Sequence, residues 1–283
     1  PVHRIGSKHG VDLMTRIGKR FEALRKARKT GFVAYITAGD PDLATTLKLV
    51  PELERRGVDV LELGVPFSDP LADGPEIQAA SQRALRHRVS IGDVLDLVAD
   101  LRQESEIPIV LFTYFNPMHR FGLERLVGNA AEAGVDGILA LDLPPEEAGE
   151  YKGLMEARGL DTIFLIAPTS GEERIRRIAS HTSGFVYYVS RTGVTGERDR
   201  LEETLGDKVA AIRRHTSQPV AVGFGISTPE QSREVAGYAD AVVVGSAIVR
   251  RIAERQDDPD LVSHIGAFVE KLAQPLKGAS DGS

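Results

Sequence analysis

The segment VDVLELGVP, residues 58–66, decides the fold. It is almost continuously apolar, which is typical of a strand that helices cover on both faces. Seven similar runs recur along the 283-residue chain: GFVAYITAG (31–39), PIVLFTYF (108–115), VDGILALDLP (135–144), DTIFLIAP (161–168), GFVYYVS (184–190), PVAVGFG (219–225) and DAVVVGS (240–246). Helical patterns with charged outer faces lie between them. Eight strands that alternate with helices predict an α/β fold, a (β/α)8 TIM barrel.

A doubly wound open sheet is the alternative architecture. It is less favoured because the strand count is eight and no GxGxxG motif follows the first apolar run. The stretch VDLMTRIGKRFEALRKARK (11–29) predicts an extra helix that caps the amino end of the barrel. No linker divides the chain. We therefore expect a single barrel domain over residues 1–283, with loose termini at 1–10 and 278–283.

The composition excludes several classes of function. The chain has no cysteine, which rules out disulfides, zinc–thiolate sites, iron–sulfur clusters and thiol nucleophiles. A formal net charge of −6 argues against a nucleic-acid surface. The first residues lack an apolar signal segment, and no run approaches the roughly 18 apolar residues of a membrane helix. We expect a protein of the reducing cytoplasm that binds neither nucleic acid nor membrane.

One acid lies inside an apolar run. In LELGVPFSDPLADGP (61–75), strand alternation places Leu61, Leu63 and Val65 on one face and Glu62 on the other. The apolar face suits the surrounding helices, so Glu62 is expected to point into the barrel near the carboxyl ends of the strands, where barrel enzymes hold their active sites. Loss of water there would raise the pKa of Glu62 towards neutrality and make it a candidate general acid and base.

A structural ion pair is the alternative role for Glu62. None of the eight apolar runs contains Lys, Arg or His, so no partner is evident and a functional role is favoured. The same absence excludes a Schiff-base lysine on a strand. The histidines, among them His87, His119, His181 and His215, show no metal-like spacing and are expected at the surface.

Three further acids lie near strand ends. Asp69 precedes Pro70 and is expected to form a turn. Asp73 ends a loop long enough to fold back over the barrel mouth and present a carboxylate to a ligand. Asp142 ends the fourth expected strand, and three roles remain open for it: a pocket wall, a metal ligand, or a bridge to a helix N-terminus.

Two glycine-rich segments, VGFGIS (222–227) and VVGSAI (243–248), end the seventh and eighth apolar runs directly before helices. Glycine lets backbone N–H groups approach an anion, and a helix N-terminus adds favourable dipole charge. Since barrels commonly bind phosphate after strands 7 and 8, the two segments together predict a substrate that carries a phosphate.

The sixth run is followed by SRTGVTG (190–196), whose Gly, Ser and Thr content suits a mobile lid. Aromatic residues gather near the strand ends: Tyr35, Phe67, Phe112, Phe115, Tyr187 and Phe224. Some of them serve core packing. Together with the phosphate site they indicate a flat apolar ligand with a phosphate at one end.

These motifs together resemble one family, the tryptophan synthase alpha subunits. LELGVPFSDPLADGP is similar to the second strand and following loop of that family, SRTGVTG to its loop 6, and GFGIS (223–227) with VGSAI (244–248) to its phosphate cradle. The resemblance runs from about Phe32 to Ile252. It implies cleavage of indole-3-glycerol phosphate to indole and D-glyceraldehyde 3-phosphate in L-tryptophan biosynthesis, a carbon–carbon lyase reaction of the retro-aldol type.

The resemblance also implies roles for individual residues. Glu62 matches the principal acid and base, which protonates indole C3 and removes the glycerol hydroxyl proton. Asp73 matches the acid that assists at the indole N–H. The remaining matches are to substrate-binding positions: Thr195 orienting Asp73, Tyr187 lining the site near Glu62, Tyr35 and Phe112 flanking the indole, and Gly196, Phe224, Gly225, Gly245 and Ser246 holding the phosphate. Phe185 departs from the family, in which tyrosine is frequent, and removes one hydroxyl from the pocket wall.

The resemblance implies no metal and no organic cofactor in this chain. Alpha subunits of this family bind a beta subunit that carries pyridoxal phosphate, in an α2β2 heterotetramer through which indole is channelled. The segments PFSDP (66–70) and NPMHRFG (116–122) are the corresponding interface candidates.

Other functions remain possible at this stage. A metal-dependent aldolase could use Glu62, Asp73 and Asp142 as oxygen ligands. A largely non-catalytic barrel could act by activating a beta subunit, and a stand-alone lyase could release indole without a partner.

Overall fold

A computed structural model describes residues 14–189, 198–223 and 225–278, with the backbone alone for 198–204. Apart from Gly278, the terminal segments expected to be loose lie outside this range. Nine parallel strands form one sheet in the order β5-β4-β3-β2-β1-β9-β8-β7-β6. Their bounds are β1 Gly31–Thr37, β2 Val60–Gly64, β3 Ile109–Thr113, β4 Gly137–Ala140, β5 Asp161–Ile163, β6 Leu165–Ile166, β7 Val186–Val189, β8 Val220–Gly223 and β9 Ala241–Val244.

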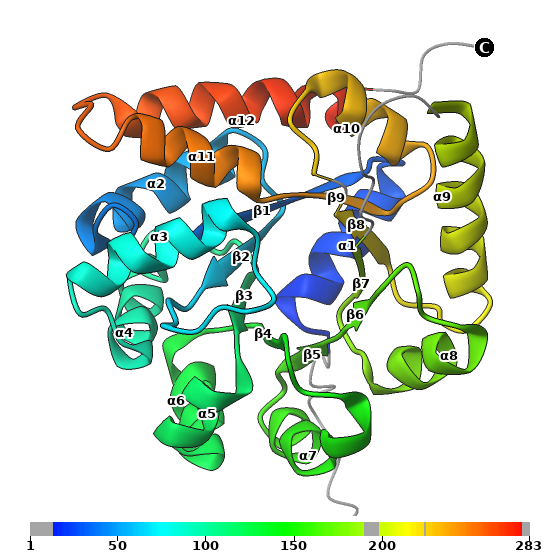
Figure 1. Cartoon of the computed structure of the whole chain (residues 1–283), viewed down its shortest axis with the longest axis horizontal. Helices are drawn as coiled ribbons and strands as arrows, with labels where there is room; N and C mark the ends of the chain where they lie inside the picture. The colour runs from blue at the N-terminus through cyan, green and yellow to red at the C-terminus, as the bar shows by residue number, and fades with distance from the viewer. Residues whose placement is uncertain (1–13, 190–197, 224, 279–283) are drawn as a thin grey trace, which may run out of the picture.

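The predicted barrel is confirmed, and its fifth strand is split. β5 and β6 lie at the two ends of the strand order, yet only Phe164 separates them along the chain, so together they close the barrel. Helices surround the strands (Figure 1). They are α1 Arg16–Lys26, α2 Leu43–Arg55, α3 Pro75–Arg86, α4 Ile91–Leu101, α5 Phe115–Phe121, α6 Leu123–Ala133, α7 Gly149–Ala157, α8 Glu172–His181, α9 Arg198–Arg213, α10 Pro229–Ala236, α11 Ser246–Glu254 and α12 Leu261–Lys277, with a 3-10 turn at Pro145–Glu147.

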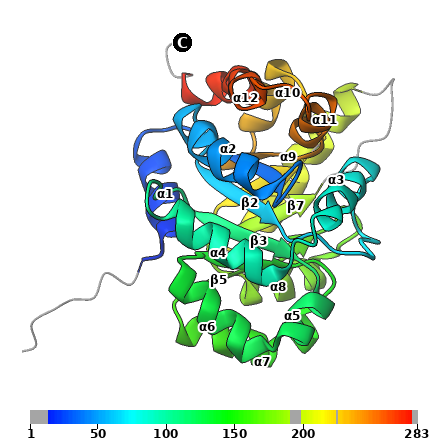
Figure 2. The same cartoon turned by 90° about the vertical axis from the view of Figure 1, so that its left-hand side faces the viewer.

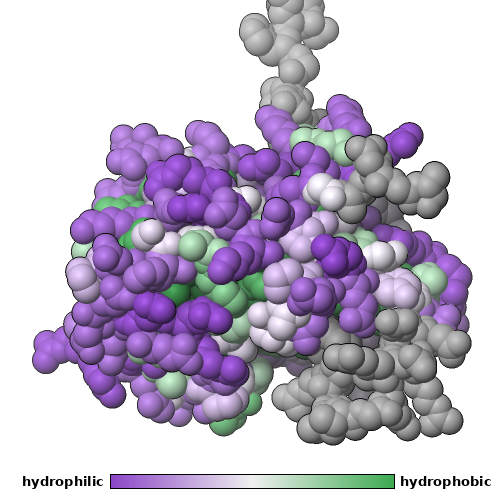
Figure 3. All heavy atoms as spheres, turned by 90° about the horizontal axis from the view of Figure 1, so that it is seen from above, coloured by the Kyte–Doolittle hydropathy of each residue, from purple (hydrophilic) through white to green (hydrophobic). Residues whose placement is uncertain are grey.

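Local signals in the sequence explain where several helices begin and end. Ser90 and Asp93 form a reciprocal capping box at the start of α4, and Thr228 and Gln231 do the same at α10. Gly134 ends α6 in the left-handed conformation, which favours glycine. None of the helices in the described ranges is long and apolar enough to cross a membrane. The face over the helices at the top of Figure 1 is mainly hydrophilic, with small apolar areas (Figure 3).

Strand alternation divides the core into two parts. Outward residues such as Leu61 and Leu63 pack against the surrounding helices, whereas inward residues such as Val60 and Val110 fill the barrel interior. Apolar residues of α1 join the inner cluster: Ile17, Phe21 and Leu24. Seen along the barrel, α1 lies within the ring of strands, and seen from the side it lies at one end (Figures 1 and 2). The predicted capping helix is therefore confirmed.

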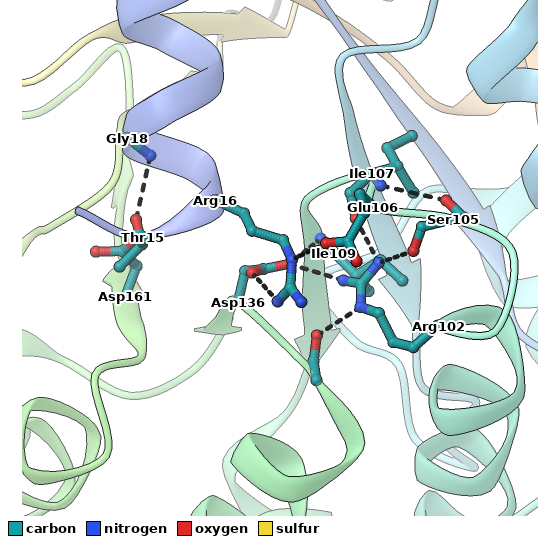
Figure 4. A network of polar contacts seen from close by, with 11 residues as sticks. Thr15, Arg16, Gly18, Arg102, Ser105, Glu106, Ile107, Ile109, Asp136 and Asp161 are labelled. Carbon is teal, nitrogen blue, oxygen red and sulfur yellow. Dashed lines mark hydrogen bonds and ion pairs between the residues drawn. The ribbon is translucent and has the colours of Figure 1, made fainter. Parts of the chain in front are cut away.

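An ion-pair network around the buried Asp136 fixes this amino end of the barrel (Figure 4). Asp136, which directly precedes β4, accepts a hydrogen bond from the backbone N–H of Ile109 in β3 at 2.8 Å. The same carboxylate binds Arg102 at 2.8 Å and Arg16 of α1 at 3.1 Å. Asp136 thus joins two neighbouring strands, a crossover helix and the capping helix at one point.

Two other aspartates repeat this arrangement at the starts of strands. Asp59 accepts the backbone N–H of Phe32 at 2.7 Å, and Asp240 accepts that of Val220 at 2.8 Å. Each carboxylate lies just before its own strand and bonds the strand beside it. The buried backbone donors at the amino edge of the sheet therefore have charged acceptors, which form stronger hydrogen bonds than neutral ones.

Removal of the Asp136 carboxylate should destabilise the whole barrel. We expect Asp136→Ala to lower the free energy of unfolding by about 3 kcal/mol, because it leaves the backbone N–H of Ile109 without its acceptor and the Arg102 guanidinium without its negative partner. Urea unfolding followed by circular dichroism measures this. The exposed Asp100 of α4 supplies the matched control, since Asp100→Ala should change stability by less than about 0.5 kcal/mol. Equal midpoints for the two variants would contradict the prediction.

Candidate active site

Glu62 points into the barrel, as the alternation of β2 predicts. It lies opposite Tyr35 of β1 and Val110 of β3 in the strand register, and both neighbours belong to the inner cluster. Its exposed fraction is 0%. The side chain therefore lies between the apolar interior and the carboxyl ends of the strands.

The carboxyl group of Glu62 has no hydrogen-bond partner in the described part of the chain. Both of its oxygens are buried and unpaired. Burial without a compensating donor raises the pKa of Glu62 to about 8, since the charged form loses its water. The structural ion pair considered as the alternative is thus not formed among the described residues. A carboxyl that is mostly protonated at neutral pH is suited to donate a proton.

Two tyrosines flank Glu62, and two glycines make room for them. A Cβ atom at Gly64 would overlap the hydroxyl of Tyr35, and one at Gly223 would overlap that of Tyr187. Burial raises the pKa of both tyrosines above the ordinary value, so both phenols stay neutral. The close approach of a phenol explains each glycine at its strand end, a role that the sequence did not reveal.

An aromatic wall continues from Tyr35. The ring of Phe112 in β3 meets that of Tyr35 edge-on, with 5.0 Å between the centroids. The Tyr35 hydroxyl lies 3.3 Å from that of Thr37. The structure brings Tyr35 and Phe112 into contact on the inner side of the barrel that also holds Glu62, so the two rings form one apolar wall.

Asp73 is held over the mouth by three contacts. Its carboxylate accepts a hydrogen bond from the Tyr114 hydroxyl at 3.0 Å, its backbone carbonyl accepts one from Gln78 of α3 at 2.9 Å, and its backbone N–H donates to Pro70 at 3.1 Å. Burial raises the pKa of Asp73 to about 6, although the hydrogen bond from Tyr114 opposes this rise.

Sequence reasoning missed Tyr114. The sequence pattern singled out Phe112 and Phe115, between which Thr113 and Tyr114 lie. Tyr114 directly follows β3, so its position at a strand end was the available signal. The hydroxyl that distinguishes Tyr114 from Phe112 and Phe115 makes the contact with Asp73.

The structure decides between the roles left open for the other acids. Asp142 accepts the backbone N–H of Phe115, the first residue of α5, at 2.6 Å, so it is the bridge to a helix N-terminus. Asp69 is exposed and accepts a hydrogen bond from Ser68 at 2.6 Å, as a loop residue would. No group of three potential metal-binding side chains occurs within residues 14–189, 198–223 and 225–278. Glu62, Asp73 and Asp142, the acids considered for a metal-dependent aldolase, therefore do not form a set of metal ligands in the described structure.

The expected phosphate cradle lies at a helix N-terminus. Gly245 caps α11 and Ser246 is its first residue, so the first N–H groups of this helix have no intrahelical acceptor. Gly225 adopts a positive φ of 65°, and a Cβ atom there would have no neighbour within 4 Å. The two segments meet where β8 and β9 pair, beside β1. This site favours an anion.

Three predicted site residues lie outside the described ranges: Thr195, Gly196 and Phe224. Their roles remain predictions. A cleft of about 910 Å³ does lie elsewhere, between α1 and the amino ends of β7 to β9, but it contains none of the predicted residues. Size alone therefore does not locate the chemistry, which we place at the opposite end of the barrel by the unpaired acid and the anion site.

Comparison with known proteins decides the family. The family model described as tryptophan synthase alpha chain matches residues 21–277. The chain belongs to this family. The tryptophan synthase alpha chain of Citrifermentans bemidjiense is 52% identical over 267 residues, which cover 94% of this chain and 100% of the relative. That of Geobacter sulfurreducens is 51% identical over 263 residues, covering 93% and 99%.

Solved structures of tryptophan synthase have the same fold as this chain. The tryptophan synthase subunit alpha of Legionella pneumophila superposes with a TM-score of 0.86 at 39% identity, covering 93% of this chain and 98% of that one. A tryptophan synthase structure from Mycobacterium tuberculosis gives a TM-score of 0.85 at 33% identity, covering 94% and 100%. The resemblance to the tryptophan synthase alpha chains and the TIM-barrel prediction are thus confirmed.

The raised pKa of Glu62 should appear in the stability of this alpha chain. Between pH 5 and 8 the unfolded chain releases the Glu62 proton while the folded chain keeps it, so stability falls as the pH rises. Glu62→Gln cannot titrate. We expect it to gain on the order of 3 kcal/mol relative to the wild type over this interval, measured by urea unfolding at both pH values.

The exposed Glu104 provides the control, because Glu104→Gln should follow the wild type across the same interval. A Glu62→Gln variant whose stability runs parallel to that of the wild type at pH 5 and 8 would show that the buried carboxyl is not neutral in the folded state.

Proposed function

We propose that this chain cleaves indole-3-glycerol phosphate to indole and D-glyceraldehyde 3-phosphate, the lyase step that serves tryptophan biosynthesis. The observation that carries the proposal is the buried, unpaired carboxyl of Glu62 beside an aromatic wall and near an anion site. Membership of the tryptophan synthase alpha chain family supports it. The remaining described features fit one substrate with a flat ring, a hydroxyl-bearing carbon and a phosphate.

Glu62 would supply both proton transfers. With a pKa of about 8 it is mainly protonated at neutral pH and can deliver a proton to indole C3. The resulting carboxylate then removes the hydroxyl proton from the glycerol carbon bonded to C3. The oxygen electrons form the aldehyde, the C3–carbon bond breaks, and its electron pair returns to the ring as indole. One carboxyl thereby gives one proton and recovers one.

Asp73 would act at the ring nitrogen. Protonation of C3 places positive charge on the indole nitrogen, and a nearby carboxylate stabilises that charge. The pKa of Asp73, about 6, lies below neutrality, so this acid is mainly ionised where Glu62 is mainly protonated. The two acids therefore hold the opposite charge states that the two roles require.

The substrate phosphate would bind at the N-terminus of α11. Gly245 and Ser246 would hold it through backbone N–H groups, assisted by Gly225. Gly245 also lies against Tyr35, since a Cβ atom there would be 3.3 Å from that of Tyr35. Phosphate and ring would therefore be bound on adjacent strands.

The partner in this proposal is a tryptophan synthase beta subunit, with pyridoxal phosphate bound in the partner. The loop after β2 and helix α5 together line a cleft of about 360 Å³ with Phe67, Pro117 and Phe121. Leu71 in the same loop is 92% exposed. Apolar side chains on two neighbouring segments suit a protein interface. The loop also carries Asp73, so a partner bound here would contact the segment that holds a catalytic acid.

An assay of indole release from indole-3-glycerol phosphate tests the proposal. We expect the wild type to release indole and Glu62→Gln to lose about 100- to 10,000-fold in kcat, because the amide can neither donate nor recover the proton. Glu104→Gln should retain wild-type turnover. The assay is run with and without a beta subunit. Absence of indole in both arms would overturn the proposal, whereas release only with the beta subunit would exclude a stand-alone lyase.

A charge change at the phosphate site tests substrate binding. Ser246→Asp places a carboxylate against the phosphate and should raise KM by about 10-fold or more, while an acid in the first turn of a helix does not impair folding. Ser263→Asp, in the exposed first turn of α12, is the matched control and should leave KM unchanged. An unaltered KM for Ser246→Asp would place the phosphate elsewhere.

A further inference from the structure

The hydroxyl of Tyr114 connects two neighbouring residues of the loop after β2. It accepts a hydrogen bond from the backbone N–H of Ala72 at 3.0 Å and lies 3.0 Å from the carboxylate of Asp73. Tyr114 itself is buried at the carboxyl end of β3, where it precedes α5. The contact therefore spans from a barrel strand to the loop that holds the second acid.

The Ala72 contact fixes the direction of the second hydrogen bond. A backbone N–H can only donate, so the Tyr114 oxygen is the acceptor from Ala72. The hydroxyl proton then remains for Asp73. A donor aimed at a carboxyl stabilises its ionised form, because a carboxylate accepts with both oxygens whereas a protonated carboxyl needs an acceptor for its own proton.

The backbone next to Tyr114 is also fixed. Asp142, two residues after β4, accepts the N–H of Phe115 at 2.6 Å, and the ring centroid of Phe67 lies 5.1 Å from that of Tyr114. Asp142 thus fixes the backbone beside Tyr114, and the ring of Phe67 contacts the Tyr114 side chain itself. Its hydroxyl has little freedom to turn away from Asp73.

Few titratable groups of the described residues face Asp73. Tyr114 contacts it from the end of β3, and Tyr35 faces it from β1. Both are neutral phenols, since burial raises the pKa of each. The described part of the chain shows no cation paired with this carboxylate, so the Tyr114 hydroxyl is the side-chain donor seen to act on it.

We infer that Tyr114 is a positioning residue that keeps Asp73 ionised and oriented towards the ring nitrogen of the substrate. The mechanistic part of this inference rests on the proposed function. Tyr114 acts through Asp73 and does not itself exchange a proton with the substrate. The Tyr114 hydroxyl, oriented by the N–H of Ala72, opposes the effect of burial on Asp73. Asp73 is therefore ionised at a pH at which Glu62 is still protonated.

The test is the pH at which Asp73 titrates, with and without the hydroxyl. Tyr114→Phe removes the donor and should move the Asp73 titration upwards by about one pH unit. Carbon-13 NMR of the carboxyl groups in the full chain measures it, and Asp73→Asn identifies the resonance. Tyr151→Phe is the matched control, because the buried Tyr151 donates only to the backbone carbonyl of Ile138 at 2.9 Å and its loss should leave Asp73 unchanged.

A second substitution keeps the test decisive if Tyr114→Phe does not fold. Incorporation of 3-fluorotyrosine at position 114 retains the shape and makes the phenol a stronger donor, which should move the Asp73 titration downwards. An Asp73 titration that coincides in the wild type and in the variants would overturn the inference. Because the NMR measurement uses no substrate, it stands even if indole release is never observed, whereas that second failure would overturn the proposed function alone.

Loss of the Tyr114 hydroxyl should also change the pH dependence of catalysis. If the chain releases indole, the acid limb of the kcat/KM profile should move upwards by about one pH unit in Tyr114→Phe, since more of Asp73 is then protonated near neutrality. A variant in which kcat falls at every pH without movement of this limb would show that Tyr114 only supports the fold of the loop.

Discussion

The candidate site depends on the burial of one carboxyl group, that of Glu62, which has no hydrogen-bond partner among the described residues. An isolated charge in a dry interior is so unfavourable that the group takes up a proton instead, and Glu62 accordingly has a pKa of about 8. A cation close to it would lower that value and remove the acid. The inner faces of the neighbouring strands meet this constraint with apolar residues and neutral tyrosines.

The two ends of the barrel treat buried acids in opposite ways. At the amino end, Asp136 is almost as buried as Glu62 but receives donors from Ile109, Arg102 and Arg16. It therefore ties strands and helices together. At the carboxyl end, Glu62 receives none in the described structure and remains reactive. The paired acids at the amino end stabilise the fold, which offsets the cost of an unpaired acid at the other end.

Much of this arrangement was predictable because it follows from short-range periodicity. The apolar runs fix the strands, and alternation alone turns Glu62 inwards, away from Leu61 and Leu63. The split of the fifth strand at Phe164 was not predicted, since the sequence around it, IFLIAP (163–168), is continuously apolar. The break in strand pairing at Phe164 depends on how the barrel closes, and a local sequence pattern does not predict that.

The contacts of the site were less predictable, for a related reason. The need for glycine at Gly64 and Gly223 comes from tyrosines that reach across from neighbouring strands. The choice among three roles for Asp142 was settled by its distance to Phe115, which lies 27 residues earlier in the chain. Sequence indicates which residue types can perform the chemistry. It does not indicate which backbone group a side chain will reach once the strands are in register.

The difference in pKa between Glu62 and Asp73 has a small structural cause. Glu62 and Asp73 both have pKa values raised by burial, to about 8 and about 6, on either side of neutrality. Asp73 accepts a hydrogen bond from Tyr114, whereas Glu62 accepts none among the described residues. This donor lowers the pKa of Asp73, because a hydrogen-bond donor stabilises the ionised carboxylate. Its proton is directed by a backbone N–H in the same loop as Asp73. A movement of this loop would therefore move Asp73 and Ala72 together relative to Tyr114, so a substrate or partner that orders the loop would order both hydrogen bonds to the Tyr114 hydroxyl.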